Sequence, residues 1–181
     1  MKFIFADSLD LVDPHFDFLA DESPRGRKPY WDDQYPHELL GYAPYDGILV
    51  SRGIVGDHRF QGKYSSSQSM RFNRVGAREF LRLNKGPLKN LPIYGDCGAF
   101  SYVDQEVPPY TPEEMIQFYE HGVFTHACSV DHIIFEFDRN ARGMEGGSPA
   151  ARERFDITLE NAAAFLNVAR RQKSPFTPMG V

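Results

Sequence analysis

Short apolar runs alternate along this chain with longer stretches of helical periodicity. The apolar runs have the length and composition of buried strands and cover residues 2–6, 47–51, 91–95, 125–134 and 176–181. Strands that alternate with helices predict a parallel sheet, either open or closed into a barrel. We therefore expect an α/β fold with these strands at its centre.

The first predicted helix covers residues 66–85 and has two distinct faces. One face carries Phe72, Gly76, Phe80 and Leu83. The nearly opposite face carries the basic residues Arg71, Arg74, Arg78, Arg82 and Lys85. We expect this basic face to point into solvent.

The second predicted helix has a clear beginning and end. Thr111 is suited to the N-cap, Pro112 to the first helical position, and Glu114 to the closing position of a capping box. The helix should end at His121, before Gly122. A third helix is predicted over residues 150–172, where apolar residues recur at helical spacing.

Two segments lack such patterns. Residues 14–44 contain several prolines and aromatic residues and predict a long, structured insertion. Residues 138–149 contain two glycine-bearing pairs and predict a mobile loop.

Composition limits the kinds of protein that this chain can be. Its 181 residues are 41% hydrophobic and 14% aromatic, which is enough for a packed core in one domain over residues 1–181 and excludes global disorder. Two cysteines, Cys97 and Cys128, cannot form a disulfide framework. The apolar run at residues 2–6 is too short for a signal peptide, and no later run is long enough to span a membrane. We therefore expect a cytoplasmic protein without a membrane partner.

Charge is distributed unevenly along the chain. The whole chain has a formal net charge of −5, yet residues 52–89 contain nine basic and two acidic residues, a local charge of +7. The remaining residues therefore sum to −12. A basic segment on an acidic protein favours a local anionic partner, with a simple solvated face as the alternative.

The strand at 91–95 leads into the first group of chemically informative residues. Asp96 follows this strand directly, at the carboxyl edge where parallel sheets place their functional sites. Gly98 permits a tight turn beside a ligand, and Phe100 offers a flat apolar surface. The alternative is that Asp96 only caps the turn that follows.

A second acidic residue follows the next strand run. Strand alternation places Ser129 and Asp131 on one face and His132 on the other, so Asp131 and His132 are not expected to chelate one ion. Asp96 and Asp131 are thus expected to converge on one pocket. Such a pair suits recognition of a purine edge or general acid/base catalysis.

Other familiar sites have weaker support. His121, His126, Cys128 and His132 are close in sequence but do not match a zinc-binding spacing, so we predict no metal site. The chain also contains no G-x-S-x-G nucleophile motif, phosphate loop or G-x-G-x-x-G fingerprint.

Several segments of the chain, including those that contain Asp96 and Asp131, resemble segments of the tRNA-guanine transglycosylase superfamily. The resemblance rests on the segments 96–102 (DCGAFSY), 107–111 (VPPYT) and 129–134 (SVDHII), supported by 3–8 and 45–52. It is greatest to the DNA-modifying branch, the deoxypurine-in-DNA protein A type. In the tRNA enzymes the first motif reads Asp-Ser-Gly-Gly-Phe-Gln, whereas Cys97, Ala99 and Ser101 stand here in place of Ser, Gly and Gln.

The resemblance implies a (β/α) barrel that replaces guanine in nucleic acid with a 7-deazaguanine, such as 7-cyano-7-deazaguanine. Asp96 matches the general acid/base, Asp131 the residue that recognises the purine edge, and Phe100 the aromatic residue that stacks on the base. Cys97, Gly98 and Ser129 complete the expected base-binding set. The expected contacts with nucleic acid come from the basic residues Arg52, Arg71, Arg74, Arg78 and Arg82.

The resemblance also implies parts that this chain lacks. A complete barrel has about 250 residues, and the family's nucleophilic Asp and three-Cys-one-His zinc site lie further along. We therefore expect an amino-terminal half to two-thirds of the barrel, without zinc, which a second chain or a homo-oligomer could complete. The expected function is insertion of a 7-deazaguanine into DNA. The alternatives are an archaeosine- or queuine-type tRNA enzyme, a non-catalytic binding remnant, and an unrelated barrel hydrolase with Asp96 and Asp131 as its carboxylate pair.

Overall fold

A five-stranded parallel sheet forms the centre of the protein. The computed structural model describes residues 1–136 and 147–181, so residues 138–146 of the predicted loop lie outside it. The strands are β1 (Ile4–Asp7), β2 (Gly47–Ser51), β3 (Ile93–Asp96), β4 (His126–Cys128) and β5 (Thr177–Met179). They lie in sequential order and every neighbouring pair is parallel.

The predicted α/β architecture is therefore confirmed, although β4 and β5 are shorter than the apolar runs at 125–134 and 176–181 that predicted them. The apolar run at 125–134 forms a strand only as far as Cys128, and the residues after it continue without strand pairing to the sheet. Among the described residues β1 and β5 are the edge strands of this sheet. Closure into a barrel remains a prediction.

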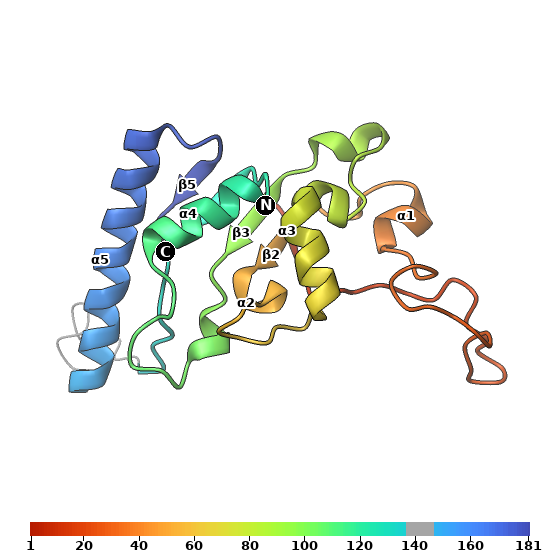
Figure 1. Ribbon diagram of the computed structural model, residues 1–181, viewed down its shortest axis with the longest axis horizontal. Helices are drawn as coiled ribbons and strands as arrows, with labels where there is room; N and C mark the ends of the chain where they lie inside the picture. The colour runs from red at the N-terminus through yellow and green to blue at the C-terminus, as the bar shows by residue number, and fades with distance from the viewer. Residues whose placement is uncertain (137–146) are drawn as a thin grey trace.

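Helices cover one face of the sheet (Figure 1). The helices of the described residues are α1 (Pro36–Leu40), α2 (Arg52–Val55), α3 (Ser66–Phe80), α4 (Pro112–His121) and α5 (Pro149–Gln172), with short 3-10 turns at η1 (Gly86–Asn90) and η2 (Ala99–Tyr102). Helices α3, α4 and α5 lie along the sheet, whereas α1 lies to its side and α2 follows the end of β2. Alternation along the strands separates the two faces: Val50, Ile93 and Ala127 are fully buried, whereas Tyr94 and His126 are half-buried. The main hydrophobic core therefore lies between the sheet and its helices. None of the helices in the described residues combines the length and hydrophobicity needed to cross a bilayer.

The sequence identified two helices accurately, α4 from its capping residues and α5 from the spacing of its apolar residues. Thr111 accepts a hydrogen bond from the Glu114 backbone N–H, and Glu114 accepts one from the Thr111 N–H, which completes the predicted capping box of α4. Gly122 ends this helix as predicted. The third helix begins at Pro149, one residue earlier than predicted, and Ser148 caps it.

The predicted end of the first helix was wrong. Helix α3 stops at Phe80 rather than at residue 85, and it is interrupted at Gly76, whose φ is +79°. The Ala77 N–H beyond this break donates to the Gly122 carbonyl, so a contact with the turn after α4 replaces an intrahelical bond. Arg82 then adopts a left-handed conformation with φ +58°, which ends the helical path.

The insertion at 14–44 is structured, as predicted. It contains α1 and two isolated antiparallel bridges, Val12–Gln34 and Asp17–Glu22. Arg82 attaches the insertion to the end of α3, because its guanidinium donates to the carbonyl oxygens of Tyr30 and Asp33.

Candidate functional site

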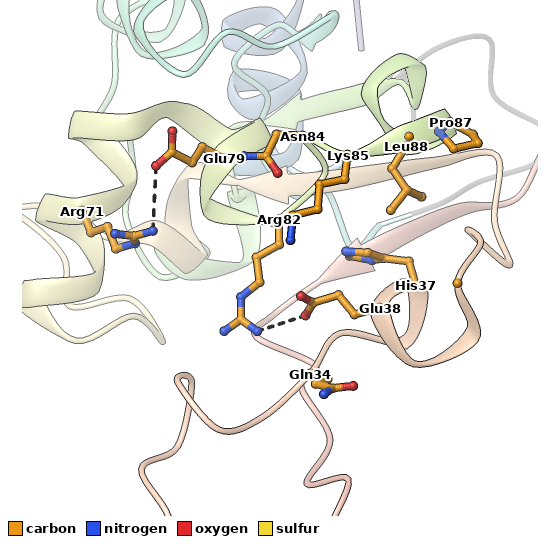
Figure 2. A pocket seen from close by; sticks show the side chains of 12 residues that line it. Gln34, His37, Glu38, Arg71, Glu79, Arg82, Asn84, Lys85, Pro87 and Leu88 are labelled. Atoms are coloured by element: carbon orange, nitrogen blue, oxygen red, sulfur yellow. Dashed lines mark hydrogen bonds and ion pairs between the residues drawn. The ribbon is translucent and has the colours of Figure 1, made fainter.

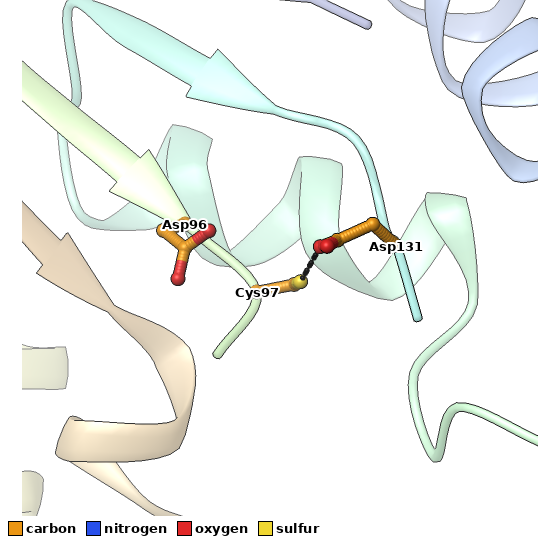
Figure 3. A group of neighbouring side chains, drawn as sticks. All are labelled: Asp96, Cys97 and Asp131. Carbon is orange, nitrogen blue, oxygen red and sulfur yellow. Dashed lines mark hydrogen bonds between the residues drawn. The ribbon is translucent and has the colours of Figure 1, made fainter. Parts of the chain in front are cut away.

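Asp96 and Asp131 come together at the carboxyl edge of the sheet. Asp96 is the last residue of β3, and Asp131 lies three residues beyond the end of β4. One side-chain ligand atom each of Asp96, Cys97 and Asp131 lies within 4.8 Å of the others (Figure 3). The predicted convergence of the two carboxyl groups is confirmed, although Asp131 reaches this position from an extended segment rather than from a strand.

The β3 alternation places Asp96 on the sheet face opposite the helices. Ile93 is buried, and a side chain at Gly95 would overlap the ring of Tyr119 in α4, so both positions face the helical layer. Tyr94 and Asp96 therefore face the other way. The ring of Tyr94 stacks on His126 with centroids 4.3 Å apart, on the same face as Asp96.

The Asp96 carboxyl group is held by the turn that follows it. Its Oδ2 accepts a hydrogen bond of 2.9 Å from the Gly98 N–H, and Ser51, its partner across the β2–β3 pairing, also supplies a hydrogen bond. Burial and the nearby charge of Asp131 raise the pKa of Asp96, and these two effects outweigh the hydrogen bonds. A carboxyl group with a raised pKa is suited to proton transfer near neutral pH.

The tight turn at Gly98 is present as predicted. Gly98 has φ +84°, and a side chain there would overlap the Ser51 hydroxyl and press against Gly53. This turn leads into η2, in which the Phe100 side chain is 76% exposed. Phe100 thus presents the flat apolar surface that its position predicted.

Cys97 lies between Asp131 and a tyrosine that the sequence reasoning did not assign. Its Sγ donates to Asp131 Oδ1 at 2.8 Å, and the Tyr102 hydroxyl lies 3.0 Å from Sγ and 2.9 Å from the Asp131 carbonyl oxygen. Burial, followed by the charges of Asp96 and Asp131, raises the pKa of the Cys97 thiol. The only sequence signal for Tyr102 is its place at the end of the segment 96–102.

The neighbours of Asp131 have other contacts. Ser129 is buried; its hydroxyl accepts a hydrogen bond from the Val181 N–H, and its own N–H donates to Met179, so its described contacts are with β5. His132 Nε2 lies 2.7 Å from the Gln105 carbonyl oxygen, and this ring nitrogen must therefore be the donor. Asp131 and His132 point to different partners, as strand alternation predicted.

Asp96, Cys97 and Asp131 also form the group among the described residues that could hold a metal ion. A metal-bound cysteine is a thiolate. Here the thiol proton is hydrogen-bonded to Asp131, and burial opposes its loss. In this protonation state the group offers the carboxyl oxygens of Asp96 and Asp131 as acceptors, and Cys97 is a hydrogen-bond donor to Asp131.

The predicted solvent-facing basic surface was wrong for Arg71, Arg78 and Arg82, which are half-buried, and Arg52 of the expected nucleic-acid-binding set also has its contacts within the protein. The Arg52 guanidinium pairs with Asp57 at 2.9 Å and lies 4.5 Å from the centroid of the Phe118 ring, with its side chain only 16% exposed. Arg78 donates to the carbonyl oxygens of Leu88 and Leu91. The two guanidinium groups are therefore bonded to oxygen atoms of the protein itself, a carboxylate for Arg52 and two backbone carbonyls for Arg78.

The remaining members of the set differ from one another. Arg71 donates to the Tyr30 hydroxyl and lies 5.5 Å from the centroid of the Trp31 ring. Arg82 forms the attachment to the insertion described above and an ion pair of 3.0 Å with Glu38. Arg74 and Lys85 are exposed, so these two residues of the basic face predicted for residues 66–85 fit the solvent-facing role.

A cavity lies away from the acidic pair. It has a volume of about 650 Å³ and is lined by residues of the insertion, the end of α3 and the start of η1 (Figure 2). Part of the lining precedes β2 (Gln34 to Gly41) and part precedes β3 (Asn84 to Leu88), so the cavity lies near the amino ends of these two strands.

The comparisons agree with the family resemblance. The chain is 44% identical, over 183 aligned residues, to a protein from Salmonella montevideo named DNA-guanine transglycosylase. The alignment includes 100% of this chain and 42% of that protein, so the chain spans less than half the length of this relative. No protein-family model matches the chain. The similarity supports a guanine transglycosylase as the kind of protein to which this chain is related.

Proposed function

We propose that this chain carries the base-recognition and acid/base site of an enzyme that replaces guanine in DNA with a 7-deazaguanine. The observation that carries the proposal is the convergence of Asp96 and Asp131 at one edge of the parallel sheet. The five parallel strands in sequential order also support a (β/α) barrel around this edge.

Recognition of the base is assigned to Asp131 and Phe100. A carboxylate offers two acceptor oxygens side by side, which match the N1–H and the exocyclic amine of guanine or 7-deazaguanine. Adenine presents an acceptor at N1 and would be repelled. The exposed ring of Phe100 can cover one face of the base.

Proton transfer is assigned to Asp96. Base exchange breaks the bond between C1′ of the sugar and guanine N9, and it forms a bond from the same C1′ to N9 of the incoming base. The departing guanine gains a proton and the incoming base loses one, so a single carboxyl group can give a proton and recover it. The raised pKa of Asp96 suits it to both steps.

DNA is the substrate that the observations favour. The similar Salmonella protein is named for DNA, and Cys97, Ala99 and Ser101 depart from the motif of the tRNA enzymes. A target base in duplex DNA must leave the stack to reach a pocket.

The first test is binding of free bases to the purified chain, measured by calorimetry. Guanine and 7-cyano-7-deazaguanine should bind, and adenine should not. Asp131→Asn should weaken guanine binding at least about tenfold, because one acceptor oxygen becomes a donor. Equal binding of adenine, or unchanged guanine binding in Asp131→Asn, would contradict the recognition role.

The second test is incorporation of labelled 7-cyano-7-deazaguanine by the complete protein into duplex DNA and into tRNA, with Asp96→Asn as the matched variant. Incorporation into DNA that is lost in the variant supports the proposal. Incorporation into tRNA alone would identify a tRNA enzyme. Base binding without incorporation into either substrate would identify a non-catalytic binding protein.

A further inference from the structure

The Cys97 thiol occupies a position that suggests a role other than direct binding of the base. Its Sγ is fully buried, and it lies between the side chain of Asp131 and the hydroxyl of Tyr102. Tyr102 is itself buried and reaches both Sγ and the backbone carbonyl of Asp131. The two side chains thus hold Asp131 at two points, one on its carboxylate and one on its main chain.

We propose that Cys97 and Tyr102 are positioning residues that fix the Asp131 carboxylate in the orientation needed to distinguish guanine from purines without a 2-amino group. This inference rests on the proposed function and deepens it, because it concerns how the base site obtains its specificity. It differs from a direct contact between Cys97 and the base, which the family resemblance implied.

The direction of the hydrogen bonds supports this role. The thiol is neutral because burial and two neighbouring carboxyl groups oppose its ionisation. Asp131 Oδ1 can only accept, so the Cys97 S–H must be the donor of the 2.8 Å contact. A buried, neutral thiol is a poor nucleophile, which makes a covalent role for Cys97 unsuitable.

The orientation of a carboxylate determines which base it can recognise. Guanine presents two adjacent donors, N1–H and the exocyclic amine, and both can be satisfied only when the two carboxylate oxygens lie in the plane of the base. Hypoxanthine has the N1–H donor but no 2-amino group, so it needs only one well-placed oxygen. A carboxylate free to rotate would therefore lose affinity for guanine more than for hypoxanthine.

The experiment compares the dissociation constants of guanine and hypoxanthine for the purified chain, measured by calorimetry. The variants are Cys97→Ala, Cys97→Ser and Tyr102→Phe. Tyr110→Phe is the matched control, because the Tyr110 hydroxyl is buried in the same aromatic cluster and has no hydrogen-bond partner among the described residues. Urea unfolding of each variant establishes that it is folded at the temperature of the titration.

The wild-type chain should prefer guanine, and Cys97→Ala should reduce this preference about tenfold, the effect of losing one hydrogen bond to a charged group. Cys97→Ser should keep most of the preference because it restores a donor, and Tyr102→Phe should lose part of it. Tyr110→Phe should not change it.

Failures of the two proposals can be distinguished. If the wild-type chain binds neither base, the proposed function fails. If the wild-type chain prefers guanine and a folded Cys97→Ala or Tyr102→Phe variant keeps the full preference, the positioning role is overturned while the proposed function stands. If Cys97→Ala does not fold, the comparison of Cys97→Ser and Tyr102→Phe with Tyr110→Phe decides between the same two outcomes.

Discussion

A side chain at Gly98 would overlap the hydroxyl of Ser51, because the turn after β3 runs directly against the end of β2. Both residues supply hydrogen bonds to Asp96. Gly98→Ala should therefore displace the turn, weaken guanine binding by at least about tenfold and destabilise the fold by roughly 2–4 kcal/mol through strain and overlap. Calorimetry and urea unfolding measure the two effects.

Gly26 provides the matched control for this substitution. It has the same φ of +84°, but a side chain there would meet nothing within 4 Å. Gly26→Ala should cost only about 1–2 kcal/mol of backbone strain and leave guanine binding unchanged. Equal effects of the two substitutions would show that the contact with Ser51 is unimportant.

Asp7, at the end of β1, predicts a pH dependence of stability. This carboxyl group is 3% exposed, and burial raises its pKa to about 6 despite hydrogen bonds from Leu9, Asp10 and Tyr64. Because the pKa is higher in the folded than in the unfolded chain, its stabilising contribution is complete below about pH 4 and is lost as pH rises through 6. The rise of the Asp7 pKa from 3.8 to about 6 corresponds to roughly 3 kcal/mol of folding stability.

Urea unfolding between pH 4.5 and 7.5 tests this prediction. The free energy of unfolding of the wild type relative to Asp7→Asn should fall as pH rises through 6. The Asp7→Asn profile keeps the contributions of Asp96, whose pKa is raised, and of His37 and His126, whose pKa values are lowered by burial. Asp57→Asn is the control: the pKa of Asp57 is lowered to about 2, so its titration lies below this range. Parallel profiles for wild type and Asp7→Asn would refute the assignment to Asp7.

Arg82 should contribute to stability rather than to binding of nucleic acid. It pairs with Glu38 (Figure 2), donates to two backbone carbonyls of the insertion, and lies 5.0 Å from the centroid of the Tyr30 ring. Arg82→Ala should lower the free energy of unfolding by about 2–4 kcal/mol, because it leaves these acceptors without their partner. Protease digestion should then cut preferentially within residues 14–35.

Arg74→Ala is the matched control for Arg82→Ala. Arg74 is exposed on α3, so its loss should change stability by no more than about 0.5 kcal/mol. If the two variants had equal stability, Arg82 would not be the residue that attaches the insertion.

The sequence predicted those features that depend on local interactions. The capping box of Thr111 and Glu114 joins residues three positions apart, so it identified the start of α4 correctly. The strand ends placed Asp96 and Asp131 at one edge because parallel strands share a direction. These signals were sufficient for the sheet, the order of the elements and the acidic pair.

The features that the sequence did not predict depend on contacts between distant residues. The break at Gly76 is accompanied by a hydrogen bond from Ala77 to Gly122, and the conformation of Arg82 by contacts with the insertion. The Cys97–Asp131 hydrogen bond joins residues 34 positions apart. Periodicity places a side chain on a face of its element, but it does not identify the partner on another element.

The charge of Asp131 should control the pKa of Asp96. Burial is the larger cause of the raised pKa of Asp96, and the neighbouring Asp131 carboxylate is the next. Asp131→Asn removes the charge but keeps the side-chain volume, so the pKa of Asp96 should fall while burial keeps it above its usual value. Carboxyl carbon NMR of the aspartate-labelled chain, with Asp96→Asn to assign its signal, follows this titration directly.

Asp46→Asn is the control for this experiment. Asp46 is exposed and accepts a hydrogen bond from the Phe3 N–H at the start of the chain, so its substitution should leave the Asp96 titration unchanged. An Asp96 pKa that stays constant or rises in Asp131→Asn would show that the two carboxyl groups do not interact, and the shared site would then lose its electrostatic basis.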